Sequence, residues 1–224
     1  MKLPCPHPVD WSLYLVTDPG FLPAEDVVGH VLKAVEGGVS VVQLRDKQAS
    51  DRELEPQALA LQQALPEQVP LFINDRVDLA LRLGLHLHIG QDDMPYIQAR
   101  QLLPDEQMIG LSINHRSHLD SCLVTCRQAG VRPPDVLGLG PLAATPTKPD
   151  AAPALGLEGI TELANLASAA GIASVAIGGI QASNAAHLAS TGVDGICVVS
   201  ALMGSPTPAQ AARQLRNLFE GKST

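Results

Sequence analysis

Short apolar runs recur along this chain, and most of them end in polar or glycine residues. The runs are mostly unalternated and rich in β-branched residues or leucine, which is typical of strands buried on both faces of a sheet. Eight of them occur, at residues 13–17, 39–44, 70–73, 85–89, 108–111, 135–139, 174–177 and 195–199. Each is short enough to be one strand of a covered, parallel sheet.

Stretches with a helical pattern lie between these runs. Residues 24–36 carry valine and leucine at a period of 3.6, and Gly37 and Gly38 then end the pattern. Further helices are expected at residues 51–65, 76–83, 95–103, 117–129, 157–170, 183–190 and 207–219. Eight strand–helix units in 224 residues predict a single (β/α)8 TIM barrel rather than an open sheet. We expect this barrel domain to span residues 11–224, after a flexible N-terminal arm at residues 1–10.

Composition excludes several classes of partner. The net charge is −8, aromatic residues make up only 3%, and the sequence has no basic run. Nucleic acid and anionic membranes are therefore not expected as partners.

The four cysteines include no CxxC pair, and Cys122 and Cys126 are expected to share a buried helix face rather than bind zinc. The first ten residues resemble no signal peptide, so we expect a cytoplasmic protein.

The second apolar run leads directly into charged residues. Gln43, Arg45 and Lys47 alternate with Leu44 and Asp46. A period of two would direct the first three side chains to one face, the interior or mouth of the barrel. A guanidinium binds phosphate oxygens in a bidentate way, and an ammonium adds a mobile point charge. The alternative, which we consider weaker, is that these cations are solvated and paired with nearby acids.

Two consecutive strands end in carboxylates. Asp75 follows the third run, and Asp92 and Asp93 follow the fourth. Neighbouring strands of a barrel would bring Asp75 close to one of the latter pair. Two carboxylates with open water positions form the kind of magnesium site that also binds substrate phosphates. For any single aspartate, a role in a turn or helix cap is an equally good explanation.

A second anion site is expected at the last two strands. Gly178 and Gly179 follow the seventh run, and Val199 and Ser200 end the eighth. Barrels often bind a phosphate through backbone N–H groups of these two loops. The long loop at residues 140–156 carries a weaker signal, the sequence Thr145-Pro146-Thr147-Lys148. His86 and His88 lie two residues apart on one strand and could form a metal pair, but a packed or hydrogen-bonded role is more common for such residues. His115 or His118 could act as a base, and we interpret both as solvated or capping residues.

Taken together, these motifs resemble the thiamine phosphate synthase family over nearly the whole chain. The matching segments are Leu13-Tyr14-Leu15-Val16-Thr17-Asp18, Val42-Gln43-Leu44-Arg45-Asp46-Lys47, Phe72-Ile73-Asn74-Asp75-Arg76-Val77-Asp78-Leu79-Ala80, His88-Ile89-Gly90-Gln91-Asp92-Asp93, Gly138-Leu139-Gly140-Pro141, Thr145-Pro146-Thr147-Lys148 and Ala176-Ile177-Gly178-Gly179-Ile180. The resemblance implies a transferase that joins 4-amino-2-methyl-5-hydroxymethylpyrimidine diphosphate to a thiazole phosphate. Thiamine phosphate and pyrophosphate would be the products.

The resemblance also implies roles for individual residues. The pyrimidine diphosphate would be held by Gln43, Leu44, Arg45, Asp46, Lys47, Asn74, Ser112 and Lys148. The thiazole phosphate would be held by Thr145, Pro146, Thr147, Gly179, Val199 and Ser200. Asp75 and Asp93 would hold Mg²⁺. Arg45, Lys47 and Lys148 would act catalytically by neutralising the leaving pyrophosphate in a dissociative reaction.

The sequence departs from the family pattern in places. The expected histidine after Ser112 is replaced by Asn114, and Ala143 and Ala144 stand where an aromatic residue and a proline are usual. One rival function is a thiazole tautomerase with the same barrel, and another is a non-catalytic phosphate-binding barrel. The charged strand ends argue against both. Small phosphorylated substrates are the expected partners, and a homodimer is the assembly that we consider.

Overall fold

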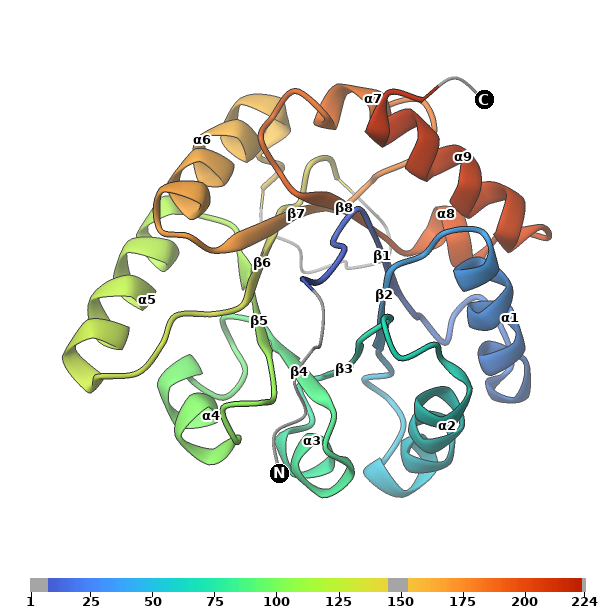
Figure 1. The fold of residues 1–224 in the computed structure, drawn as a ribbon, viewed down its shortest axis with the longest axis horizontal. Helices are drawn as coiled ribbons and strands as arrows, with labels where there is room; N and C mark the ends of the chain where they lie inside the picture. Colours follow the sequence, from blue (N-terminus) through green and yellow to red (C-terminus); the bar gives the residue numbers. More distant parts are fainter. Residues whose placement is uncertain (1–7, 145–152, 223–224) are drawn as a thin grey trace.

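The computed structural model describes residues 8–144 and 153–222, and these residues form a closed barrel with helices around it (Figure 1). All eight predicted strands are present, and each pairs in parallel with its neighbours in chain order until β8 pairs with β1. The strands are β1 (Leu13–Val16), β2 (Val41–Leu44), β3 (Leu71–Asn74), β4 (His86–Ile89), β5 (Ile109–Ile113), β6 (Val136–Leu139), β7 (Ala173–Ile177) and β8 (Gly195–Val198). The predicted TIM barrel is confirmed.

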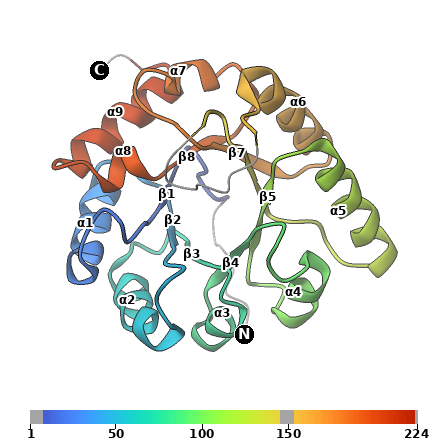
Figure 2. The same ribbon diagram turned by 180° about the vertical axis from the view of Figure 1, so that it is seen from behind.

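Helices surround the barrel and cover its outer face, as both views along its axis show (Figures 1 and 2). They are α1 (Ala24–Glu36), α2 (Asp51–Ala64), α3 (Val77–Leu83), α4 (Tyr96–Leu102), α5 (Arg116–Ala129), α6 (Gly156–Ala169), α7 (Ala185–Leu188), α8 (Ser200–Met203) and α9 (Pro208–Glu220). Two differences from expectation stand out. The helix expected at residues 183–190 forms only over Ala185–Leu188, and the short helix α8 after β8 was not predicted.

Alternation along the strands divides the apolar residues into two layers. The residues that face outwards, such as Leu13, Leu15 and Leu44, join one large core between the sheet and the helices. The residues that face inwards form a smaller cluster inside the barrel. Its members are Tyr14, Val16, Val41, Phe72, Val136, Val175 and Cys197. Side-chain direction in a strand has a period of two, so the same strand supplies both layers.

The segment before β1 packs against one end of the barrel. Trp11 lies 6.1 Å from Phe72 and 6.4 Å from Tyr14, measured between ring centroids. Val9 packs on the same inner cluster, and an Asp10 carboxylate oxygen lies 2.6 Å from a guanidinium nitrogen of Arg216. Of the arm expected at residues 1–10, residues 1–7 lie outside the described part of the chain, and Val9 and Asp10 are held on the barrel by these contacts.

The two cysteines on α5 occupy the positions that their spacing predicts. Cys122 and Cys126 are both buried, and their sulfur atoms lie 3.9 Å apart. Burial raises the pKa of the Cys122 thiol to about 12, so the thiol stays protonated at neutral pH. Among the described residues, no group of three or more His, Cys, Asp or Glu side chains could hold a metal ion. The burial of both side chains agrees with the structural role that their spacing predicts.

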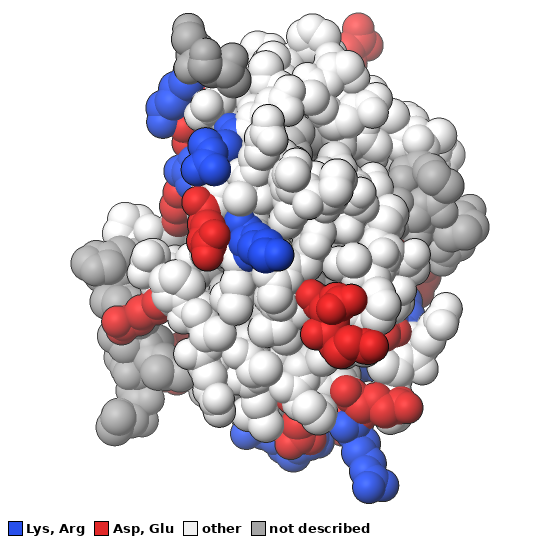
Figure 3. Space-filling view, turned by 90° about the vertical axis from the view of Figure 1, so that its right-hand side faces the viewer, with Lys and Arg blue, Asp and Glu red and all other residues white. Residues whose placement is uncertain are grey.

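The outer surface seen from the side of α1 and α9 carries scattered charge. On this face, acidic and basic side chains of the described residues alternate in small groups, and much of the surface is uncharged (Figure 3). None of the described helices is long and apolar enough to cross a membrane.

Gly195 provides a test of how tightly the barrel is closed against the segment before β1. A Cβ atom at Gly195 would lie 1.8 Å from the carbonyl oxygen of Trp11, a backbone atom that cannot move aside alone. We expect Gly195→Ala to lower the free energy of unfolding by about 2 kcal/mol or more. Urea unfolding followed by circular dichroism would measure the change.

Gly29 is a matched control for this substitution. It lies in α1, and a Cβ atom there would meet nothing within 4 Å. Gly29→Ala should raise the free energy of unfolding by about 0.5–1 kcal/mol, because alanine favours helix. Similar effects of the two substitutions would contradict the close packing of Gly195 on Trp11.

Candidate active site

One pocket opens at the face of the barrel that is formed by the carboxyl-terminal ends of the strands. The residues that line it come from all eight strands and the loops that follow them. They are Tyr14, Val16, Gln43, Arg45, Lys47, Asn74, Asp75, His88, Gly90, Asp93, Ser112, Ile113, Asn114, Gly138, Gly140, Pro141, Val175, Ile177, Gly178, Gly179, Ile180, Cys197, Val199 and Ser200. In barrels of this kind, active sites lie at this same face.

Most of the predicted site residues that the structure describes lie in this pocket. Those in the lining are Gln43, Arg45, Lys47, Asn74, Asp75, Asp93, Ser112, Gly179, Val199 and Ser200. Leu44 and Asp46 do not line it. Leu44 faces the outer core, as alternation requires, and the Asp46 carboxylate accepts hydrogen bonds from the backbone of Gln48 and Ala49. Thr145, Pro146, Thr147 and Lys148 lie outside the described residues.

The end of β2 supplies the cations of the pocket. The Arg45 guanidinium lies 3.5 Å from the Asp18 carboxylate, and the Thr17 hydroxyl bonds to both the N–H and the carbonyl of Arg45. Lys47 extends further out, and its ammonium lies 3.0 Å from an Asp75 carboxylate oxygen. These contacts aim both cations at the mouth of the barrel, where they could bind an anion.

Asp75 is the most perturbed group at the rim. Its φ is +62°, which makes it the only non-glycine residue with positive φ in the described chain. Burial and the neighbouring Asp93 carboxyl raise the pKa of Asp75 to about 6, although the Lys47 ammonium opposes them. The Asp93 carboxylate also accepts a hydrogen bond from the backbone of Gly90 at 2.6 Å. Backbone strain and a raised pKa at one residue are typical of a functional site.

This pair of carboxylates fits a divalent cation. Asp75 and Asp93 are close enough to raise the energy of the doubly ionised state, and a cation between them would remove that repulsion. Magnesium takes oxygen ligands and is usually held by one or two carboxylates, with water and substrate phosphates in the other positions. The pair therefore has the donor set that Mg²⁺ requires.

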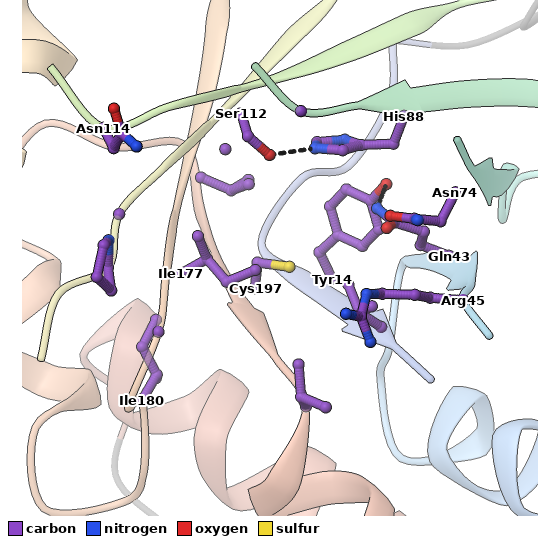
Figure 4. A pocket seen from close by; sticks show the side chains of 18 of the residues that line it. Tyr14, Gln43, Arg45, Asn74, His88, Ser112, Asn114, Ile177, Ile180 and Cys197 are labelled. Carbon is purple, nitrogen blue, oxygen red and sulfur yellow. Dashed lines mark hydrogen bonds between the residues drawn. The ribbon is translucent and has the colours of Figure 1, made fainter. Parts of the chain in front are cut away.

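The interior wall of the pocket carries a few polar, uncharged side chains among apolar ones. The Gln43 amide donates to the buried Tyr14 hydroxyl at 3.0 Å, and a His88 ring nitrogen lies 3.0 Å from the Ser112 hydroxyl (Figure 4). Burial lowers the pKa of His88 to about 4, so its imidazole is neutral at physiological pH. Such a wall can hold an uncharged ring with hydrogen-bonding atoms at its edge.

The side of the pocket at β7 is built from backbone. Gly178 and Gly179 have φ values of +95° and +70°, and a Cβ atom at Gly178 would lie 2.6 Å from Pro141. The loop after β6 runs beside them, since the Leu142 and Ala143 amides donate to the carbonyls of Ile177 and Gly178. Glycine is needed here for both the backbone conformation and the close approach.

The residues that sequence reasoning missed or undervalued belong mostly to the pocket interior. Tyr14, Asn114 and Cys197 are not among the predicted site residues, and for His88 the sequence favours a packed or hydrogen-bonded role. Alternation along β1 and β4 could have placed Tyr14 and His88 inside the barrel. His86 is packed, as predicted: its ring lies against Phe72 at an interplanar angle of 47°, and it accepts a hydrogen bond from the backbone of Met108. His115 caps α5, also as predicted.

Comparisons with known proteins identify the family of this chain. The family model described as thiamine monophosphate synthase matches residues 13–202. A thiamine-phosphate synthase of Syntrophomonas wolfei is 47% identical over 94% of this chain and 97% of its own length. The solved thiamine phosphate pyrophosphorylase of Pyrococcus furiosus is 33% identical, with a TM-score of 0.79 over 95% of this chain and 97% of its own.

Another relative is much longer than this chain. The thiamine biosynthesis multifunctional protein ThiED of Corynebacterium efficiens is 53% identical over 94% of this chain, which covers only 29% of that protein. A solved 3-hexulose-6-phosphate synthase, at 16% identity and a TM-score of 0.64, shares the fold alone. By the matched residues and by these relatives, the chain belongs to the thiamine monophosphate synthase family.

Proposed function

We propose that this chain is a thiamine phosphate synthase. It joins 4-amino-2-methyl-5-hydroxymethylpyrimidine diphosphate to 4-methyl-5-(2-phosphoethyl)thiazole or its carboxylate, and it releases pyrophosphate, together with CO2 when the carboxylate is the substrate. The observation that carries the proposal is the placement of Arg45, Lys47, Asp75 and Asp93 at one rim, opposite the glycine-built wall at β7. Such a pocket offers separate places for a diphosphate and a monophosphate. Membership of the family supports the same activity.

The reaction that fits these groups is dissociative. The bond between the pyrimidine methylene carbon and the diphosphate oxygen breaks first, and its electron pair leaves with pyrophosphate. The thiazole nitrogen then gives its lone pair to the methylene cation and forms the new C–N bond. No proton has to be removed by a strong base, which agrees with a pocket wall of neutral polar side chains. The enzyme's work is to stabilise the leaving group and align two substrates.

Each substrate is assigned to one part of the pocket. Gln43, Asn74 and Ser112 face the pyrimidine ring, while Arg45 and Lys47 bind the diphosphate. Asp75 and Asp93 would hold Mg²⁺, which when bound neutralises charge on the diphosphate. The backbone at Gly179, with Val199 and Ser200, holds the thiazole phosphate. Thr145, Pro146, Thr147 and Lys148 keep their predicted roles as proposals, as do Leu44 and Asp46.

Other parts of the assignment stay predictions. A cytoplasmic location is the expectation from the cysteine pattern and the N-terminal sequence, and a homodimer is the assembly that we consider. The tautomerase alternative is not favoured, because its relatives are expected to lack the carboxylates that Asp75 and Asp93 provide here. A non-catalytic barrel would have no need of the strained and perturbed Asp75.

A coupling assay tests the proposed activity. Purified protein should form thiamine phosphate and pyrophosphate when it is given both substrates and Mg²⁺, and chromatography would detect both products. Omission of either substrate or of the metal should abolish formation of thiamine phosphate. Conversion of a thiazole tautomer without any coupling would transfer the assignment to the tautomerase.

The carboxylate pair should serve the pyrimidine diphosphate and not the thiazole phosphate. Asp75→Asn keeps a residue that tolerates positive φ but removes the charge. We expect it, and Asp93→Asn, to lower the coupling rate at least about a hundredfold, because a metal ligand is lost. Calorimetry should find thiazole phosphate binding nearly unchanged.

Asp92 is the matched control for this experiment. It is the exposed neighbour of Asp93 and does not line the pocket. Asp92→Asn removes the same charge and should leave the coupling rate close to that of the unaltered protein. A loss of thiazole phosphate binding in the Asp75 or Asp93 variants would argue against two separate subsites.

Metal binding should weaken as the pH falls through about 6. The pKa of Asp75 is about 6 in the folded chain, above the 3.8 of a free aspartate. In the metal-free protein, the folded state therefore favours the protonated Asp75 carboxyl. Its contribution to the free energy of unfolding is fully present below about pH 4 and is lost as the pH rises through about 6. A metal ion reverses the preference, because it binds only the ionised carboxylate.

Thermal unfolding can measure this competition between protons and metal. Mg²⁺ should raise the melting temperature clearly at about pH 7.5 and much less at about pH 5. Asp75→Asn should remove most of the effect at both pH values. An equal magnesium effect at both values in the unaltered protein would show that Asp75 is not a ligand.

A further inference from the structure

Ser112 is held from two directions by residues of one neighbouring segment. Its hydroxyl oxygen lies 3.0 Å from Nε2 of His88, which is on β4 (Figure 4). Its backbone carbonyl accepts a hydrogen bond of 2.6 Å from the Gln91 side chain, two residues beyond β4. These contacts fix both ends of Ser112 at the pocket wall. They leave open which partner of the His88–Ser112 contact donates the proton.

The surroundings of the His88 ring are unusually restrictive. His88 is 8% exposed, and its ring fills space that two glycines leave inside the barrel. A Cβ atom at Gly110 would lie 2.3 Å from Nδ1, and one at Gly138 would lie 3.4 Å from Cε1. The Nδ1 edge of the ring therefore occupies the space beside Gly110 that a side chain would otherwise fill.

This packing favours one of the two neutral tautomers of the His88 imidazole. A neutral imidazole carries one N–H, on either Nδ1 or Nε2. Within residues 8–144 and 153–222, Nδ1 has no hydrogen-bond partner. A proton there would bury an unpaired donor against the C–H groups of Gly110, whereas a proton on Nε2 finds the Ser112 oxygen. A buried, unpaired N–H is the costlier arrangement, so the proton belongs on Nε2.

We propose that His88 is a positioning residue, which donates from Nε2 to the Ser112 hydroxyl and so turns the hydroxyl proton towards the pocket. Ser112 then acts as a hydrogen-bond donor to the substrate. This inference rests on the proposed function, in which the acceptor is a ring nitrogen of the aminopyrimidine. His88 acts through Ser112 and takes no part in proton transfer. The specificity that results is for a ring with an acceptor atom at that edge.

Nuclear magnetic resonance tests the donor assignment without any substrate. Long-range ¹H–¹⁵N correlation spectra of ¹⁵N-labelled protein distinguish the two neutral forms of histidine, and His88→Gln identifies which signals belong to His88. We expect the Nε2–H form at neutral pH. An Nδ1–H form, or a protonated ring, would overturn the proposal. The result does not depend on whether the chain couples the two substrates.

Binding of the pyrimidine alone tests the consequence. The probe is 4-amino-2-methyl-5-hydroxymethylpyrimidine without phosphates, measured by calorimetry on variants whose fold is checked by circular dichroism. His88→Leu removes the donor and should weaken binding about tenfold, the effect of one hydrogen bond. His88→Gln keeps an N–H group and should recover part of the loss. Binding of magnesium pyrophosphate should be unchanged in both.

His86 provides the matched control. It lies two residues earlier on the same strand and faces the same interior, but it contacts Phe72 and Met108 instead of Ser112. His86→Leu should leave pyrimidine binding unchanged in the folded protein. Equal weakening by His86→Leu and His88→Leu would show a general packing effect and would overturn the positioning role.

A double-mutant comparison shows whether His88 acts through Ser112. If it does, His88→Leu should add little to the loss caused by Ser112→Ala, since the hydroxyl is already absent. In the coupling assay, His88→Leu should raise the KM for the pyrimidine diphosphate more than it lowers kcat. Fully additive losses would contradict the proposal. Failure of the unaltered protein to bind the pyrimidine would instead count against the proposed function.

Discussion

Closure of the parallel sheet is the constraint on which the site depends. β1 pairs with both β2 and β8, so no strand has a free edge and none can shift its register independently. A shift by one residue would exchange inside for outside along a whole strand. The present register places Gln43 and His88 in the interior and Leu44 in the outer core. The functional groups are thus positioned by pairing between strands that are distant in sequence.

The interior of the closed barrel has little room, and glycine decides where that room lies. Gly110 and Gly138 leave the space that the His88 ring occupies, and Gly195 admits the Trp11 carbonyl at the other end. A side chain in such a place takes the one orientation that its neighbours allow. The contact between His88 and Ser112 is therefore a property of the whole interior rather than of these two residues alone.

The sequence predicts the rim of the site better than its interior. Arg45, Asp75 and Asp93 were found because each closely follows a strand, and parallel strands gather their ends at one face. Whether His88 meets Ser112 depends on register and on glycines elsewhere, and a periodic pattern contains neither. Likewise α8 has only four residues, too few for a helical period to be recognised.

A contiguous motif does not show which of its side chains reach the pocket. The resemblance assigned the whole run from Gln43 to Lys47 to the substrate, yet alternation sends Leu44 outwards, and the Asp46 side chain caps its own loop. The fold was easier to predict than the site because a barrel requires only that each segment have the right period. A binding site requires that particular atoms from several segments meet.

Among the described lining residues, charged side chains lie on one side of the pocket only, and this distribution agrees with the proposed reaction. The charged lining residues Arg45, Lys47, Asp75 and Asp93 all follow β2, β3 or β4, whereas the described lining residues from β5 to β8 are uncharged. A departing diphosphate gains negative charge and meets the charged half. In the proposed reaction, the carbon that it leaves becomes positive towards the uncharged half, whose described lining residues include no carboxylate that could capture it. Cys197 lines the same pocket, and its thiolate form would capture such a cation. Complete burial raises the pKa of the Cys197 thiol far above its usual value, so the thiol stays protonated.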